Sequence, residues 1–166
     1  MYKSFLPANN LAPVISFGEA RISASPEETD VVHDLLAFLA GQMNEMNKSN
    51  RKEISGFISW LEQELGVKID TLSQKGVIEE FYLWEAEAVI SVLKKNKKKI
   101  ALDPSRRTLK EKVETEMAAS KAKLMPLLSG IKATDDLIDQ IVYRLYGLTA
   151  EEIEVGKKSV ISGAKK

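Results

Sequence analysis

The densest chemical feature of this 166-residue sequence is a run of cations between positions 94 and 112. Nine basic residues stand there against two acids, Asp103 and Glu111. Such groups neutralise DNA phosphates, so the run predicts salt-dependent binding to the backbone of duplex DNA without base reading. The candidate contacts are Lys94, Lys95, Lys97, Lys98, Lys99, Arg106, Arg107 and Lys110. A solvated loop at the tip of a helical hairpin is the alternative interpretation.

Aromatic residues are not interleaved with these cations in the sequence. Stacking on single-stranded nucleic acid is therefore not indicated by the pattern. Trp60 and Trp84 are spaced as helix-packing residues, and we expect both in the core rather than in a ligand pocket.

Residues suited to catalysis are scarce. His33 is the sole histidine and has no serine elbow beside it, so we interpret it as a surface or packing residue. Glu62, Glu64 and Lys68 resemble a nuclease spacing, but Gly66 ends the helix between them and places Lys68 beyond it. The other acidic clusters follow the polar faces of helical patterns. We predict no catalytic residue and no metal site.

Cofactor motifs are also missing from the sequence. No glycine-rich strand-to-helix loop for a nucleotide or S-adenosylmethionine is present, nor is the Asn/Asp-Pro-Pro-Tyr/Phe signature of amino-methyltransferases. Asp103-Pro104-Ser105 shares only two residues with that signature and is typical of a helix cap. We therefore predict no cofactor and no enzymatic activity for this chain alone.

The composition of the chain narrows the remaining classes of protein to which it could belong. The 24 basic and 24 acidic residues balance, so net charge favours neither nucleic acid nor membrane. The absence of cysteine excludes a disulfide scaffold, a thiol nucleophile and a thiolate metal site. No apolar run approaches the roughly 20 residues of a membrane span, and the N-terminus lacks a secretory-signal core. We expect a cytoplasmic protein with no membrane partner.

The first long apolar pattern predicts one helix over residues 26–65, ending at Gly66. Ser25 would cap it, with Pro26 at the first helical position. Asn50 could instead cap a second helix, but we favour the continuous helix. The positions of this pattern recur at steps of three, four or seven, and all but Asn50 are apolar: Val32, Leu36, Leu39, Met43, Met46, Asn50, Phe57, Leu61 and Leu65.

A turn region over residues 67–76 and a mid-length helix over 77–95 precede the second long pattern. That pattern begins at Asp103-Pro104, and Pro126 should kink or break the helix near 122–125, with both halves packed on the same partner. Its coiled-coil-like seam comprises Leu109, Val113, Met117, Ser120, Leu124, Leu127, Ile131, Thr134, Ile138, Ile141 and Leu145.

These elements predict an all-α fold: a long antiparallel helical hairpin (coiled-coil-like) with additional shorter helices. Residues 1–24 are expected to form an irregular N-terminal arm, extended over 14–17. Residues 25–155 would form the helical domain, and 156–166 a flexible C-terminal tail.

The C-terminal stretch has the clearest signals for where helices end and begin. Leu137, Ile141 and Leu145 line one helical face, Gly147 stands where a left-handed C-cap is needed, and Thr149 with Glu152 predicts a capping box. The segment Leu-Ile-Asp-Gln-Ile-Val-Tyr-Arg-Leu-Tyr-Gly-Leu-Thr-Ala-Glu-Glu-Ile resembles the ending of large adenine-specific DNA methyltransferases of the type IIG restriction-modification kind. Residues 35–47, 53–66 and 81–89 are similar to helical stretches of the same C-terminal region.

The resemblance implies a non-catalytic C-terminal helical module that helps hold duplex DNA or join subunits. It also implies a partner carrying the methyltransferase and target-recognition parts. The alternative hypothesis is a free-standing helical adaptor or homo-oligomerisation protein with no nucleic-acid role.

Overall fold

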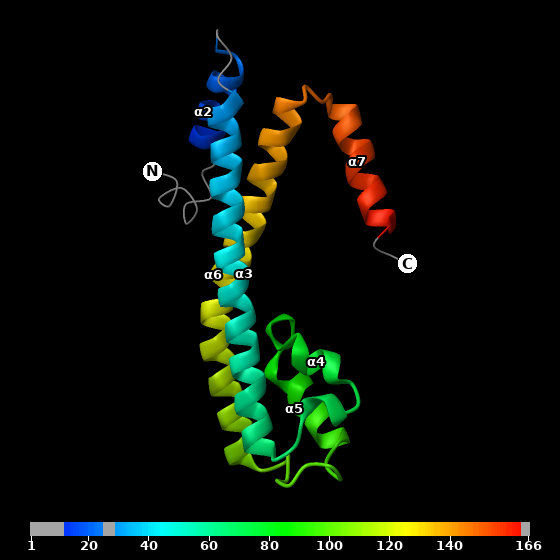
Figure 1. Cartoon of the computed structure of the whole chain (residues 1–166). Helices are drawn as coiled ribbons and strands as arrows, with labels where there is room; N and C mark the ends of the chain where they lie inside the picture. Colours follow the sequence, from blue (N-terminus) through cyan, green and yellow to red (C-terminus); the bar gives the residue numbers. More distant parts are fainter. Residues whose placement is uncertain (1–11, 25–28, 164–166) are drawn as a thin grey trace. The chain divides into compact units, whose positions relative to one another are not determined.

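The computed structural model describes residues 12–24 and 29–163 of the chain. All regular elements in this part are helical, which confirms the all-α class (Figure 1). The chain divides into two compact units, one formed by residues 1–45 with 130–166 and the other by 46–129. No helix in the described part is long and apolar enough to cross a membrane.

The helical elements follow one another along the chain in the order given next. They are α2 (Ala12–Ile22), α3 (Thr29–Leu65), η1 (Ile69–Thr71), α4 (Lys75–Glu79), η2 (Phe81–Leu83), α5 (Ala86–Lys95), α6 (Arg107–Leu145) and α7 (Ala150–Gly163). The two long helices, α3 and α6, contribute to both units.

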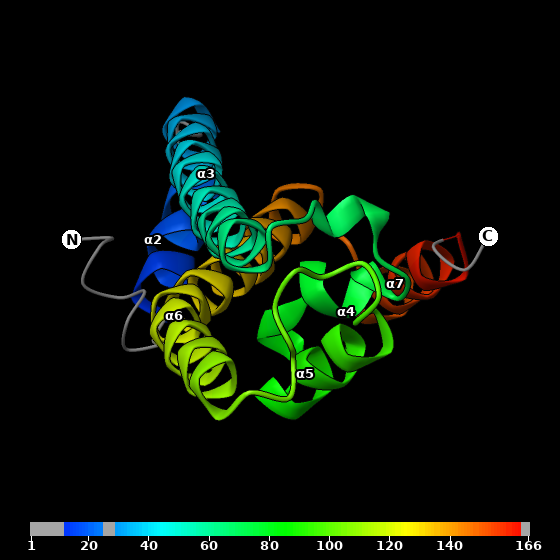
Figure 2. The same cartoon turned by 90° about the horizontal axis from the view of Figure 1, so that it is seen from below.

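Within unit 46–129, the C-terminal half of α3 packs against the N-terminal half of α6. Phe57 and Leu61 share one buried core with Val113 and Met117, and α4 and α5 complete this core beside the helix ends (Figure 2). In the other unit the N-terminal half of α3 packs against the C-terminal half of α6, since Val32 and Leu39 share a core with Leu137 and Ile141. The predicted antiparallel hairpin is therefore confirmed.

Helix α3 is continuous through Asn50, as favoured from the sequence. The helix ends at Gly66, whose φ of +65° is a left-handed conformation that glycine adopts without a side-chain penalty. The predicted cap by Ser25 and Pro26 lies outside the described residues.

Helix α6 continues past Pro126, so the proline does not break the helix, and the bend expected there stays a prediction. Proline removes the hydrogen bond to the carbonyl of Ala122, yet both residues are exposed and water can satisfy that oxygen. The helix also begins at Arg107, later than the sequence pattern predicted. Asp103 is not its cap, because the Asp103 carboxylate accepts a hydrogen bond from the Ser105 amide at 3.0 Å in the preceding turn.

The single helix predicted over 77–95 is wrong, because α4, η2 and α5 occupy this segment in its place. Trp84 and Glu85 are extended, with ψ values of 157° and 158°. Phe81 is fully buried and its ring stacks on that of Phe57 at 3.9 Å between centroids. The interruption lets Ile78 and Phe81 enter the core together with the buried face of α5.

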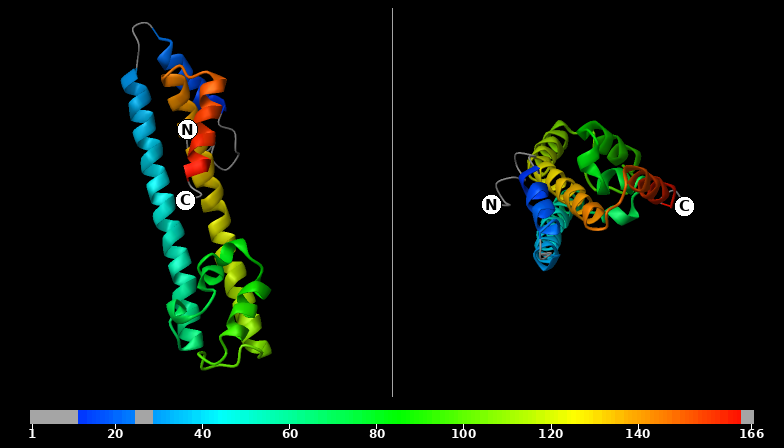
Figure 3. Two further views of the ribbon diagram at one scale, coloured as in Figure 1. Left: turned by 90° about the vertical axis from the view of Figure 1, so that its right-hand side faces the viewer. Right: turned by 90° about the horizontal axis from the view of Figure 1, so that it is seen from above.

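Two predicted irregular segments are corrected by the structure. Residues 12–22 form α2 rather than an irregular arm with an extended stretch, because Pro13 is tolerated in a first turn and Val14 packs into the core of its unit. Glu19 of α2 pairs with Arg144 of α6, and Figure 3 shows the two helices side by side. At the other end, α7 extends to Gly163, so the predicted flexible tail is helical over 156–163.

The residues that end α6 and cap the start of α7 adopt the predicted conformations. Gly147 has a φ of +63°. The Glu152 carboxylate accepts the Thr149 amide at 2.8 Å, and the Thr149 hydroxyl accepts the Glu152 amide at 3.3 Å. Hydrogen bonds from the backbone and hydroxyl of Thr149 lower the pKa of Glu152.

Replacing Phe81 with alanine should reduce the free energy of unfolding of unit 46–129 by about 3–5 kcal/mol, because it leaves a cavity beside Phe57. Both tryptophans lie in this unit, so their fluorescence during urea denaturation follows it. Leu83→Ala is the control, since Leu83 is 63% exposed and its loss should change stability by less than about 0.5 kcal/mol. Equal stability of the two variants would contradict the proposed role of the aromatic stack.

Candidate functional site

The eight predicted cations all lie on or beside the connection between α5 and α6. Lys94 and Lys95 occupy the last turn of α5, and residues 97–99 form the turn that follows. Arg106 precedes α6, while Arg107 and Lys110 belong to its first turn. All eight belong to unit 46–129. The fold therefore keeps them on one short stretch of that unit's surface.

Asn96 anchors this connection to the core. Its side-chain oxygen accepts hydrogen bonds from the Ser73 amide at 3.0 Å and the Ser73 hydroxyl at 2.8 Å. Its amide nitrogen donates to the Ser73 carbonyl at 3.0 Å and to the Val92 carbonyl at 2.9 Å. The residue is only 4% exposed, so the whole amide is buried and satisfied.

Further contacts fix the rest of the connection. Ile100 is buried in the core, and the Ala101 amide donates to the Leu65 carbonyl at the end of α3 at 3.3 Å. Pro104 and Leu109 are also buried. The lysine-rich turn is thus attached at several points and exposes its charged side chains from a fixed backbone.

Three of the eight cations have partners within the protein. Lys95 donates to the Gln74 side chain at 3.0 Å, and Lys99 donates to the Thr71 carbonyl at 2.6 Å. Arg107 pairs with Glu111 at 2.6 Å. Among the described residues, no side-chain hydrogen bond or ion pair is made by the remaining five, which are Lys94, Lys97, Lys98, Arg106 and Lys110.

The charge of the sequence is divided unequally between the two units. Residues 46–129 contain 16 basic and 12 acidic residues, a net charge of +4. Residues 1–45 and 130–166 together contain 8 basic and 12 acidic residues, a net charge of −4. A balanced total therefore conceals a cationic unit that carries the whole lysine-rich connection.

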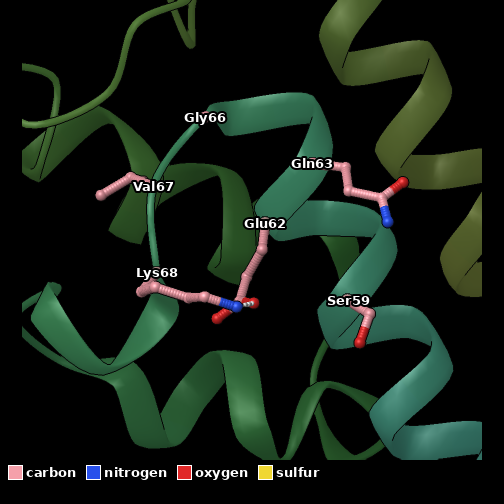
Figure 4. Close-up of a pocket in the computed structure, with 6 residues that line it drawn as sticks. All are labelled: Ser59, Glu62, Gln63, Gly66, Val67 and Lys68. Carbon is pink, nitrogen blue, oxygen red and sulfur yellow. Dashed lines mark hydrogen bonds and ion pairs between the residues drawn. The ribbon is translucent and has the colours of Figure 1, made fainter.

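A separate open cavity of about 340 Å³ lies at the end of α3 (Figure 4). Glu62 and Lys68 meet there at 2.6 Å, and the Glu62 carboxylate also accepts the Ile69 amide at 3.0 Å. The hydrogen bond from Lys68 and then that from Ile69 lower the pKa of Glu62, while the bond to Glu62 raises the pKa of Lys68. The pair closes the turn after Gly66.

The nuclease-like triple is not assembled around that cavity. Glu64 instead pairs with Lys112 of α6 at 2.8 Å. His33 is exposed on α3, in agreement with its interpretation as a surface or packing residue. In the part of the chain that the structure describes, no three histidine, cysteine, aspartate or glutamate side chains gather as a metal group.

Asn96 is the residue that sequence reasoning missed. It is the one residue other than lysine between positions 94 and 99, and an isolated amide in such a run is a usable signal. The partner, Ser73, is 23 residues away in sequence and has no motif of its own. Only the fold identifies the pair.

Replacing Asn96 with alanine should reduce the free energy of unfolding of unit 46–129 by about 1–3 kcal/mol, because the Ser73 amide loses its acceptor. Hydrogen exchange of that amide should accelerate, and urea denaturation measures the stability. Lys98→Ala serves as the control, because this exposed residue should change stability by less than about 0.5 kcal/mol. Unchanged Ser73 protection in the Asn96 variant would contradict the anchoring role.

Comparison with known proteins identifies a family but no established activity. Searches of curated proteins and of solved structures find no significant match to the chain. A family profile matches residues 30–142, which include most of α3, the short helices, the lysine-rich connection and most of α6. The chain belongs to this family, the domain of unknown function DUF8810.

Proposed function

We propose that the chain is a non-catalytic helical module that holds duplex DNA by its phosphates through the α5–α6 connection. The resemblance of the C-terminal segment, residues 137–153, to the ending of type IIG enzymes extends the proposal to the setting in which the module works. In that setting the module is the C-terminal part of a type IIG-like restriction-modification or adenine-specific DNA methyltransferase system and works beside a catalytic polypeptide.

One observation carries the DNA-binding proposal. Five cations without partners among the described residues (Lys94, Lys97, Lys98, Arg106 and Lys110) stand on a backbone that Asn96, Ile100 and Leu109 attach to the core. A fixed backbone reduces the conformational entropy lost when several phosphates are contacted together. Cations on a fixed backbone are therefore better suited to a polyanion than the same charges on a free tail.

The start of α6 adds to this cationic surface. The first turn of α6 contains no acidic residue, and Arg106 and Arg107 stand at its start. Helix N-termini present unpaired amides and a positive dipole end, both of which favour anions. The amides and the side chains thus favour the same class of ligand, an anionic oxygen such as a DNA phosphate.

Binding of duplex DNA should weaken steeply with salt. If the five cations each neutralise one phosphate, the logarithm of the association constant should fall with the logarithm of salt concentration at a slope of about −4 to −5. Fluorescence anisotropy of a labelled duplex over a salt series measures this slope. Absence of binding, or binding without a salt slope, would refute the proposal.

Reversing two of the free charges, Lys97→Glu with Lys98→Glu, should weaken DNA binding at low salt and flatten the slope by about two. Neither side chain has a partner among the described residues, so the fold should persist. Arg51→Glu with Lys52→Glu is the matched control, because it reverses the same charge in the same unit on exposed positions of α3. An equal loss of DNA affinity in both variants would indicate that DNA responds to the net charge of the unit rather than to the α5–α6 connection.

The setting requires its own test, in which the module is mixed with a catalytic polypeptide of the type IIG kind. The proposal expects the module to join that polypeptide and increase its retention on DNA. A different outcome is that the module binds DNA equally with and without that polypeptide and forms no complex with it. This outcome would leave the DNA-binding function supported and would refute the restriction-modification setting.

A helical adaptor or oligomerisation protein is the second candidate, and exposed apolar residues of the other unit favour it. Phe17 of α2 is 43% exposed, Tyr146 is 72% exposed and Val155 of α7 is 68% exposed. Singly exposed residues are common on monomers, whereas an association surface would bury them together. Sedimentation at several concentrations separates the candidates, because the adaptor predicts self-association that the Lys97 and Lys98 reversal leaves unchanged.

A further inference from the structure

A second open cavity lies in unit 46–129, beside the start of the lysine-rich connection. Its volume is about 450 Å³, within the usual range of ligand sites. Its walls come from α4, from the extended residues before α5 and from α5 itself. They are lined by Gln74, Gly76, Val77, Trp84, Ala88, Ser91, Val92 and Lys95.

Trp84 provides an aromatic wall that the core does not use. The residue is 45% exposed, which corrects the prediction that it belongs to the core, whereas Trp60 packs against the core as predicted. Among the described rings, Trp60, Phe81 and Tyr82 form aromatic pairs and Trp84 forms none. Lys121 of α6 donates to the Trp84 carbonyl at 2.6 Å and so fixes the backbone of this extended residue.

The lining of the cavity also contains a positioned cation. Lys95 donates to the side chain of Gln74 at 3.0 Å. Gln74 has a φ of 61°, a left-handed conformation that is uncommon for a residue other than glycine and is found preferentially at functional sites. No carboxylate lines this cavity. An aromatic face, apolar walls and an ammonium group therefore meet in one open site.

We infer that this cavity receives an unpaired nucleobase of DNA, stacked on Trp84, with the neighbouring phosphate on Lys95. The inference rests on the proposed DNA-binding function and deepens it. A nucleobase matches the aromatic and apolar walls, and its phosphate matches Lys95 and the adjoining Lys94, Lys97 and Lys98. The fold thus supplies the aromatic partner that the lysine run lacks in sequence.

The test compares a short oligodeoxythymidine with an abasic strand of the same length, which has the same phosphates and no bases. The full chain carries Trp60→Phe, so that Trp84 is the remaining tryptophan. The intact strand should quench Trp84 fluorescence and bind about tenfold more tightly than the abasic strand.

A Trp84→Ala variant, in the natural Trp60 background, should lose this preference by anisotropy, whereas Trp84→Phe should retain most of it. Leu83→Ala is the matched control, because this exposed neighbour does not line the cavity and its loss should leave the preference intact. Thermal unfolding followed by circular dichroism verifies that each variant folds.

Equal affinity for intact and abasic strands, or an unchanged preference in Trp84→Ala, overturns the inference. If duplex and abasic strands still bind with a salt slope, the proposed backbone-binding function survives that result. If no strand and no duplex binds, both the inference and the proposed function are wrong.

Discussion

The stack of Phe81 on Phe57 is the contact on which unit 46–129 depends. Phe57 belongs to the apolar seam of α3, and Phe81 lies at the centre of the short helical segments, so their contact at 3.9 Å joins the two. Aromatic rings bury a large apolar area and gain further from stacking. Once Phe81 is buried, the chain must leave helical geometry before α5 begins, and the extended residues 84 and 85 follow from that requirement.

The position of the cations follows from this packing in a second step. Burial of Val89, Val92 and Leu93 fixes α5, and Asn96 then satisfies its whole amide against Ser73 and Val92. A buried amide with four hydrogen bonds is tightly constrained, because each lost bond would leave a polar group without water or partner. Because Asn96 is fixed in this way, the backbone of the lysines on either side of it is fixed too.

The sequence pattern predicted those parts of the fold that depend mainly on local spacing or local backbone conformation. The long seams, the glycine stops at 66 and 147 and the Thr149–Glu152 box were all accessible, since each depends on local spacing or on a local conformational rule. The break within 77–95 and the helix over 12–22 were not, because tertiary burial of Phe81 and Val14 decides them. For the candidate site, composition identified the cations. The partner of Asn96 and the proximity of Trp84 to Lys95 depend on contacts between segments distant in sequence.

The opposite net charges of the two units have a consequence for how this protein would approach a polyanion. The field of a polyanion such as DNA would attract one unit and repel the other before any contact forms. Such guidance extends about one Debye length, roughly 10 Å at 0.1 M ionic strength, and shrinks as ions are added. The two units would therefore differ in how strongly they attract a polyanion, a difference that the balanced composition of the chain conceals.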